Sequence, residues 1–390
     1  PLAGDPLTRW GFEPDKAALL LLLAPLLVSG GGGLTRRRVM LPLALYTLLM
    51  VLTTVFSVAP AVSLWGAPAW RAGLLTWIAN ALVFFAAAGQ LGSAARRRRL
   101  VNILLAGSAP ICAYGLLQRA GLDPAAWAVE GGPRVFSTFG HPNFFAAYLA
   151  MVAPLTLERA LGARRRGERL RWAALLAAQG LCMVLTLSRS GWLGMGTSVG
   201  MVALVMAWRA GRKRLAAGLV VGAGCAALAL LALSMAPALP GHTSPLLQTL
   251  ASVFRWNSPT VQVRFLGWEA AGNMIADRPL LGFGPGTFGL ALDRYYPPRL
   301  ALFGGTRALG GHPHNLLLEM AVEVGLLGVL VYGWLVGVGL WGLWRRAREG
   351  SAEWVAMLAA AVGGLATGAL EFETVSAAML FWLLAGMAQA

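Results

Sequence analysis

The chain alternates long apolar runs with short polar connections over almost its whole length. A run of about 20 apolar residues is long enough for a helix to cross the hydrocarbon core of a bilayer. The pattern therefore predicts an all-α polytopic membrane protein. The predicted spans are residues 16–34, 39–58, 72–92, 100–117, 143–161, 172–188, 191–208, 215–234, 316–344, 353–370 and 374–389.

One polar connection is much longer than the others. Residues 235–313 separate two predicted spans, and a segment of this length inside a compact protein is usually functional. Within it, Pro259 follows a serine, as at many helix starts, and Asp277 precedes an Arg-Pro pair that marks a stop. Between these signals we expect an amphipathic helix at the membrane surface, because apolar residues recur at helical spacing. They are Val261, Phe265, Trp268 and Ile275. We predict a single integral membrane domain, residues 1–390, with this segment inserted.

Composition agrees with a membrane protein. The chain is 57% hydrophobic and 12% charged, whereas soluble domains carry about 25% charged residues. A net charge of +16 would suggest a nucleic-acid partner in a soluble protein. Here most basic residues fall in alternate connections, as expected of cytoplasmic loops, so we expect no nucleic-acid partner. These clusters are Arg36–Arg38, Arg96–Arg99, Arg159–Arg171, Arg209–Arg214 and Arg345–Arg348.

Histidines lie on the opposite side from these clusters, and two of them stand where the long segment meets the next span. Histidine exchanges a proton near neutral pH, so His314 could deprotonate an attacking hydroxyl, with His312 beside it. Asn315, Glu319 and Glu323 are four residues apart and share one helical face, where they could orient the imidazole or line a cavity. A helix cap is the structural alternative. A zinc site is disfavoured because no third ligand is apparent.

Four arginines on the same side are candidates for binding an anion. Arg189 lies in a tight hairpin between two spans, and Arg264 lies on the expected surface helix, flanked by Arg255 and Arg278. Fixed guanidinium groups could hold a phosphate or diphosphate through bidentate hydrogen bonds. The alternatives are snorkelling at the interface and contact with lipid headgroups.

Two further polar residues, His141 and Asn143, stand at the outer start of the fifth predicted span. They could support the site, or they could simply form a turn and a helix cap. The chain has no Asp-x-Asp pair of the kind that holds Mg²⁺ on a sugar nucleotide. We therefore expect a mechanism without metal or other cofactor.

Several of these motifs resemble one protein family. His314-Asn315, followed after nine residues by Gly325-Leu326-Leu327-Gly328, resembles a pattern of the bacterial O-antigen ligases. The similarity runs from about residue 135 to 330. The superfamily also contains O-antigen polymerases and protein O-oligosaccharyltransferases, which the motif does not separate. Other segments similar to the family are Phe139–Asn143, Thr186–Gly191 and Arg264–Gly282.

The resemblance implies a GT-C-like membrane glycosyltransferase with about 11–12 transmembrane helices in the bacterial inner membrane and an active site facing the periplasm. The donor would be a glycan on undecaprenyl diphosphate, and the acceptor would be a hydroxyl of the lipid A core. The reaction would invert the anomeric centre without a metal. By position, Arg189 and Arg264 would hold the diphosphate and His314 would activate the acceptor. The family usually has twelve spans, so the count of eleven points to a span that is missing from this chain or undetected.

Other functions stay open. A polymerase or a protein glycosyltransferase would use the same donor with another acceptor. A transporter for a small anion or sugar would place charges near the bilayer midplane and break helices in both halves of the chain. The ionisable residues crowd the outer edge instead. A scaffold that binds lipid-linked glycan without turnover is the remaining alternative.

Overall fold

The computed structural model describes ten of the eleven predicted spans, since the run at 16–34 lies outside the described residues. These residues form α-helices and short 3-10 turns, and they contain no strand. Six of their helices are long and apolar enough to cross a membrane. The prediction of an all-α polytopic membrane protein is confirmed. The described residues are 37–67, 71–123, 134–235, 243–253, 255, 257–305, 309, 311–371 and 374–390.

The chain folds into two compact units. Of the described residues, the first unit contains those of 37–100, 262–346 and 368–390, and the second contains those of 101–261 and 347–367. The long segment 235–313 is divided between them at Gln262. A single integral domain stays a prediction.

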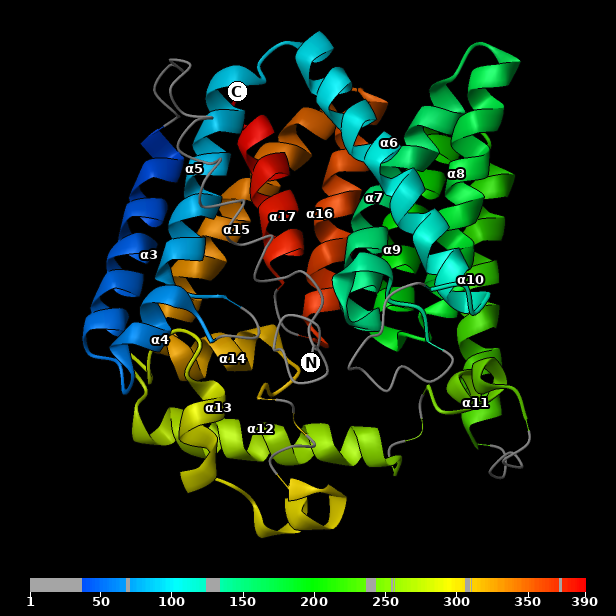
Figure 1. The fold of residues 1–390 in the computed structure, drawn as a ribbon. Coiled ribbons are helices and arrows are strands. Elements are labelled where there is room, and N and C mark those ends of the chain that lie inside the picture. The colour runs from blue at the N-terminus through cyan, green and yellow to red at the C-terminus, as the bar shows by residue number, and fades with distance from the viewer. Residues whose placement is uncertain are drawn as a thin grey trace. The chain divides into compact units, whose positions relative to one another are not determined.

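In the first unit, helices pack around a cluster of aromatic rings. Trp382 is 1% exposed and makes edge contacts with the rings of Trp77 and Tyr332, at centroid distances of 5.4 and 6.0 Å. Helix α12 enters this unit at Gln262 and lies across the lower ends of the upright helices (Figure 1). The helices are α3 (Arg37–Val55), α4 (Pro60–Trp65), α5 (Leu74–Gln90), α12 (Pro259–Asp277), α13 (Phe288–Ala291), α14 (Leu316–Glu323), α15 (Gly325–Arg348) and α17 (Val375–Met387), with 3-10 turns η3 (Leu292–Arg294) and η4 (Pro298–Phe303).

In the second unit, α7 is the central helix, with 78% of its apolar window buried. Helix α9 approaches it closely because glycine stands at the contact: a Cβ added at Gly191 would lie 2.3 Å from Cβ of Ala146. One polar contact joins the two helices, from Ser198 Oγ to the Ala150 carbonyl at 2.7 Å. The helices are α6 (Ala94–Arg119), α7 (Pro142–Gly162), α8 (Arg166–Leu185), α9 (Arg189–Arg209), α10 (Lys213–Met235), α11 (Pro245–Ala251) and α16 (Ala352–Gly368), with the 3-10 turn η2 (Ser137–Phe139).

One predicted span differs from the structure. The run 316–344 was expected to form a single helix, but it is divided into α14 and α15 at Gly325. This glycine has φ of +77°, and a Cβ there would lie 2.1 Å from the carbonyl oxygen of Leu280. Such backbone suits glycine, because any other side chain would be strained and would clash. The prediction of one continuous helix was therefore wrong.

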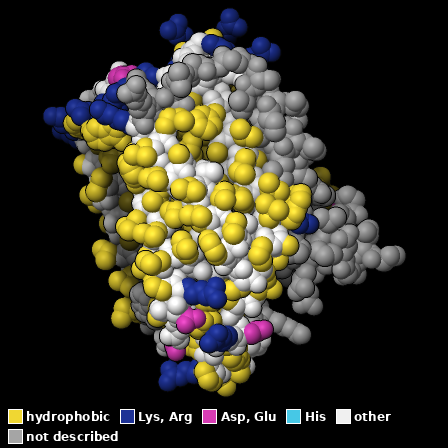
Figure 2. Space-filling model, turned by 90° about the vertical axis from the view of Figure 1, so that its left-hand side faces the viewer, with side chains coloured by type: hydrophobic (Ala, Val, Ile, Leu, Met, Phe, Trp, Pro, Cys, Tyr) yellow, Lys and Arg dark blue, Asp and Glu magenta, His cyan; other side chains and the backbone are white. Residues whose placement is uncertain are grey.

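The surface has the character expected of a protein in a bilayer. Figure 2 shows a broad band of hydrophobic side chains on one face, with Lys and Arg above it and a mixture of basic and acidic side chains below it. Exposed apolar residues include Leu41 and Leu48 of α3, at 55% and 52%, and Leu330 of α15, at 69%. A soluble surface seldom carries such a wide apolar band.

In the first unit, the arginine-rich ends and the histidine segment lie at opposite ends of the helices. Arg96–Arg99 follow α5, and Arg345 and Arg346 lie in the last turns of α15. These ends are at the top of Figure 1, whereas α12 and α14 are at the bottom. The arrangement agrees with the alternation that the charge pattern predicts.

Candidate functional site

Helix α12 begins at Pro259 and ends at Asp277, as the sequence signals predict. Its protein-facing side is a stripe of Leu266, Ala270 and Met274, each at most 8% exposed. This stripe packs on a cluster formed by the segment after the helix, which includes Phe288, Leu300 and Leu309. Phe265, on the apolar face that the sequence suggests, is 37% exposed and faces away from that cluster.

Main-chain hydrogen bonds tie the turn after α12 to α14. Phe283 N donates to the Val322 carbonyl at 2.9 Å, and Gly284 N donates to the Glu323 carbonyl at 2.8 Å. Leu326 N donates to the Pro279 carbonyl at 2.8 Å. The end of α12 and the break between α14 and α15 are thereby held together.

His314 stands directly before α14 in an uncommon backbone conformation. Its φ is +53°, in the left-handed region that non-glycine residues rarely adopt. Asn315 caps α14, since its Oδ1 accepts a hydrogen bond from Leu318 N at 3.1 Å. Trp268 Nε1 of α12 donates to the Pro313 carbonyl at 2.9 Å. The surroundings therefore fix the position of His314, at the cost of some backbone strain.

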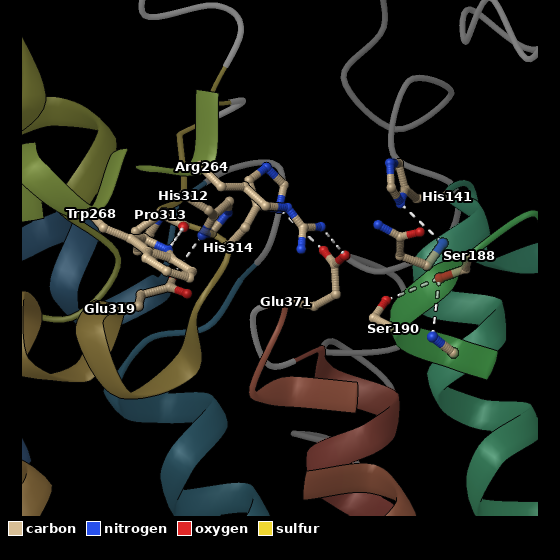
Figure 3. A network of polar contacts seen from close by, with 12 residues as sticks. His141, Ser188, Ser190, Arg264, Trp268, His312, Pro313, His314, Glu319 and Glu371 are labelled. Carbon is tan, nitrogen blue, oxygen red and sulfur yellow. Dashed lines mark hydrogen bonds and ion pairs between the residues drawn. The ribbon is translucent and has the colours of Figure 1, made fainter. Parts of the chain in front are cut away.

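A carboxylate from the turn between α16 and α17 connects the two leading candidates. Glu371 Oε1 accepts from Arg264 Nη2 at 2.6 Å, and Glu371 Oε2 lies 3.1 Å from Nδ1 of His314 (Figure 3). Glu371 is only 4% exposed. The structure thus brings Arg264 and His314 to opposite oxygens of one buried carboxyl group.

A second buried pair lies beside this group. His312 Nδ1 contacts Glu319 Oε1, and both residues are at most 9% exposed. Burial lowers the pKa of His312 to about 4. Burial also raises the pKa of Glu319 to about 8, on α14, which is not one of the six spanning helices. Both groups are therefore mostly neutral at pH 7, and His312 is a poorer proton acceptor than an ordinary histidine.

Glu319 and Glu323 also line two small cavities within the first unit. One, of about 100 Å³, is bounded by Trp77 and Tyr332 among others. The other, of about 150 Å³, is bounded by His312, by Gly286 in the turn before α13 and by Gly289 within α13. Lining a cavity is one of the two roles that the sequence analysis offered for these carboxyl groups.

Arg189 belongs to the second unit, where it begins α9. Its Nη1 donates to the Ser252 carbonyl at 2.8 Å, and its Nη2 donates to Thr260 Oγ1 at 3.1 Å. The preceding Ser188 caps the helix by accepting from Gly191 N (Figure 3). The contacts with Ser252 and Thr260 thus hold this guanidinium group in a defined direction.

His141 and Asn143 also belong to the second unit, where they brace the start of α7. His141 caps that helix, and its Nδ1 accepts from Asn143 N at 3.3 Å. Asn143 Oδ1 accepts from Arg134 Nη2 at 2.9 Å, and Arg134 Nε donates to the Thr186 carbonyl at 2.9 Å. These contacts correspond to the turn and cap that the sequence analysis kept as an alternative.

The two flanking arginines are placed differently from Arg264. Arg255 lies half-buried between α11 and α12 in the second unit. Arg278 is exposed, and its guanidinium carbon lies 4.9 Å from the ring centre of Phe283. It follows Arg264 by fourteen residues, which is about 20 Å along a helix axis. The structure therefore does not bring Arg278 to the carboxylate that Arg264 contacts.

Sequence reasoning missed Glu371, Trp268 as a hydrogen-bond donor, and Thr260. A signal for Glu371 was present: it is an acid in the short connection between the last two predicted spans. Within the described ranges, no group of three His, Cys, Asp or Glu residues could hold a metal ion. Metal independence stays a prediction.

Comparison with protein families adds to this geometry. The family model described as O-antigen ligase matches residues 172–333. A search of curated proteins finds no match. The matched residues include Arg189, Arg264 and His314, and they end before Glu371. The match over residues 172–333 supports the O-antigen ligase family, and that family suggests a glycosyltransferase-like membrane enzyme of the ligase or polymerase type.

Proposed function

We propose that the protein is an inverting glycosyltransferase that transfers a glycan from undecaprenyl diphosphate to an acceptor hydroxyl, without a metal. The active site would face the periplasm from the bacterial inner membrane, and the acceptor would be the lipid A core. The observation that carries the proposal is the contact of Arg264 and His314 with one buried carboxylate. A cation and a proton acceptor side by side are what the transfer needs.

His314 would act as the general base. A carboxylate only accepts hydrogen bonds, so the Nδ1 atom facing Glu371 carries the proton. Nε2 then holds the lone pair that can take the proton from the acceptor hydroxyl. As the hydroxyl loses its proton, its oxygen attacks the anomeric carbon of the donor, and the bond to the diphosphate oxygen breaks.

Arg264 and Arg189 would stabilise the leaving diphosphate. Negative charge grows on that group in the transition state, and fixed guanidinium groups lower the barrier by interacting with it. That both arginines hold the diphosphate is the role that the family resemblance implies for these two positions.

The test is transfer by the purified protein in lipid nanodiscs. The donor is undecaprenyl-diphosphate-linked glycan, and three acceptors are supplied separately: lipid A core, a second lipid-linked glycan and an acceptor protein. We expect transfer to lipid A core that survives treatment with EDTA. Growth of the lipid-linked glycan instead would assign the chain as a polymerase. No transfer to any acceptor, with donor bound, would leave a binding scaffold and refute the enzyme assignment.

A further inference from the structure

We infer that Glu371 is a positioning residue that sets His314 and Arg264 relative to each other and couples donor binding to the strength of the base. This inference rests on the proposed function, since it assigns how the same site is organised. Glu371 lies outside the matched residues 172–333. It comes from a turn in which Glu371 N donates to the Gly368 carbonyl at 3.2 Å.

The first argument is the order of burial. The side chain of Glu371 is 5% exposed, whereas those of Arg264 and His314 are 23% and 21% exposed. The carboxylate therefore lies behind the guanidinium and the imidazole, which are the groups that a ligand from solvent would reach. Glu371 acts through them and does not itself touch the substrate.

The second argument is the division of its hydrogen bonds. A buried carboxylate is strongly destabilising unless its oxygens are paired. Here each oxygen contacts a different group. Oε1 accepts a hydrogen bond from the guanidinium of Arg264, and Oε2 contacts the imidazole of His314. The carboxyl group thereby fixes the Nδ1–H tautomer of His314 and directs Nε2 away from itself. Among the described contacts, Arg264 donates one of its five N–H groups to Glu371. Its other N–H groups can donate hydrogen bonds to a phosphate.

The coupling follows from charge. The single negative charge of Glu371 stabilises both Arg264 and a protonated His314. When a diphosphate approaches Arg264, its negative charge offsets the positive potential that the guanidinium exerts at the imidazole, so the negative potential of Glu371 there is no longer opposed. The base then holds its proton more firmly, and it takes the proton of the acceptor hydroxyl more readily.

Other titratable or charged groups of the first unit lie near His314. They are Arg264 on the same carboxylate, His312 in the preceding turn and Glu319 of α14, while Glu323 of α14 interacts with His312 and Glu319. His312, Glu319 and Glu323 are mostly neutral at pH 7, since burial lowers the pKa of the histidine and raises the pKa of both carboxyl groups to about 8. Glu371 is thus the carboxylate expected to dominate the pH dependence of the base.

The experiment compares the pH–rate profile of transfer for Glu371→Gln and Glu371→Asp with that of the native protein. Glutamine keeps the size but removes the charge. We expect kcat to fall about 10-fold to 100-fold, as for loss of a group that orients a functional histidine. The pH below which the rate falls should also move downward, because the base is weaker. Aspartate keeps the charge and should restore the position of that limb.

The matched control is Glu269→Gln, which removes an exposed carboxylate from the same helix as Arg264. Its profile should follow that of the native protein. A rate that falls in Glu371→Gln with the acid limb unmoved would overturn the inference, because a purely structural role predicts that result. The proposed function would survive that outcome, provided that replacement of His314 still abolishes transfer.

Discussion

Arg264 and Arg189 are both fixed in place, but by acceptors of different charge. Arg264 donates to the buried carboxylate of Glu371, whereas Arg189 is oriented by a main-chain carbonyl and the hydroxyl of Thr260. An ionised partner balances much of a cation's charge before any ligand arrives, while neutral oxygens direct the group without balancing it. The comparison suggests a division of labour, with Arg189 attracting the donor and Arg264 aligning it beside the base.

The two regions share one backbone feature. His314 and Leu187, two residues before Arg189, are both non-glycine residues with positive φ, at +53° and +50°. Such conformations are unfavourable and persist where the surrounding structure enforces them. Strain at both places is what a site that needs fixed side-chain directions would show.

The largest effect should follow replacement of the base. Asparagine tolerates the left-handed backbone of His314 but cannot take up a proton near neutral pH. We therefore expect His314→Asn to lower kcat about 100-fold to 10,000-fold with little change in thermal stability. Single-turnover transfer measures the rate, and thermal unfolding of the same sample is the control. Native-like transfer by a folded His314→Asn protein would remove His314 from the mechanism.

The next effect concerns Arg264. Arg264→Ala should lower kcat about 100-fold to 1,000-fold, because a donor that stabilises the transition-state charge is lost. Arg264→Lys keeps the charge but not the planar fork, so it should recover only part of the rate. Full recovery by lysine would mean that charge alone matters, and the alignment role would be wrong.

Arg189 should behave differently. We expect Arg189→Ala to weaken donor binding about 10-fold or more, the scale of one hydrogen bond to a charged group, with a smaller change in kcat. Equilibrium binding of labelled undecaprenyl diphosphate measures this directly. If Arg189→Ala and Arg264→Ala change kcat and donor affinity in the same proportion, the proposed division between them fails.

Two hydrogen bonds that orient these regions offer a finer comparison. Thr260→Val removes the hydroxyl that accepts from Arg189, and Trp268→Phe removes the donor to the Pro313 carbonyl. Each loss is worth about 1 kcal/mol, or about 5-fold. Thr260→Val should raise the KM for donor, whereas Trp268→Phe should lower kcat. If Thr260→Val lowered kcat and Trp268→Phe raised the KM for donor, the proposed division between Arg189 and Arg264 would be wrong.

The smallest effect is on stability as a function of pH. Burial raises the pKa of Glu319 from its ordinary value of 4.5 to about 8 in the folded protein. Its contribution to stability is therefore fully present below about pH 4.5 and is lost as pH rises from there through about 8. Melting temperatures measured from pH 5 to 9 should fall less steeply for Glu319→Gln. Parallel curves for the two proteins would show that this carboxyl group is not buried as described.

The sequence predicted much of the structure around Arg264 and His314 in the first unit, but less of the chemistry there. The signals at Pro259 and Asp277 define α12 because local backbone preferences set helix ends. The pairing of Arg264 with Glu371 could not be read from the chain, since 107 residues separate them. Periodicity likewise did not reveal the break at Gly325, because the cause is the carbonyl of Leu280 from a distant turn.

The grouping of Arg278 with Arg264 shows the opposite problem, because residues that are close in sequence can lie apart in space. The two lie close in sequence and on one helical segment, which made a shared ligand plausible. A helix rises about 1.5 Å for each residue, so fourteen residues carry the second guanidinium away from the first. Closeness along a chain is thus a poor guide to convergence unless the spacing returns to the same face and the same level.

The main-chain bonds that tie the turn after α12 to α14 have a kinetic consequence. They join helix α12, which carries Arg264, to helix α14, which directly follows the His314 segment. The accepting carbonyl groups are those of Val322, Glu323 and Pro279. The loss of conformational entropy needed to align these two groups therefore occurs once, when the chain folds, and does not recur at each turnover.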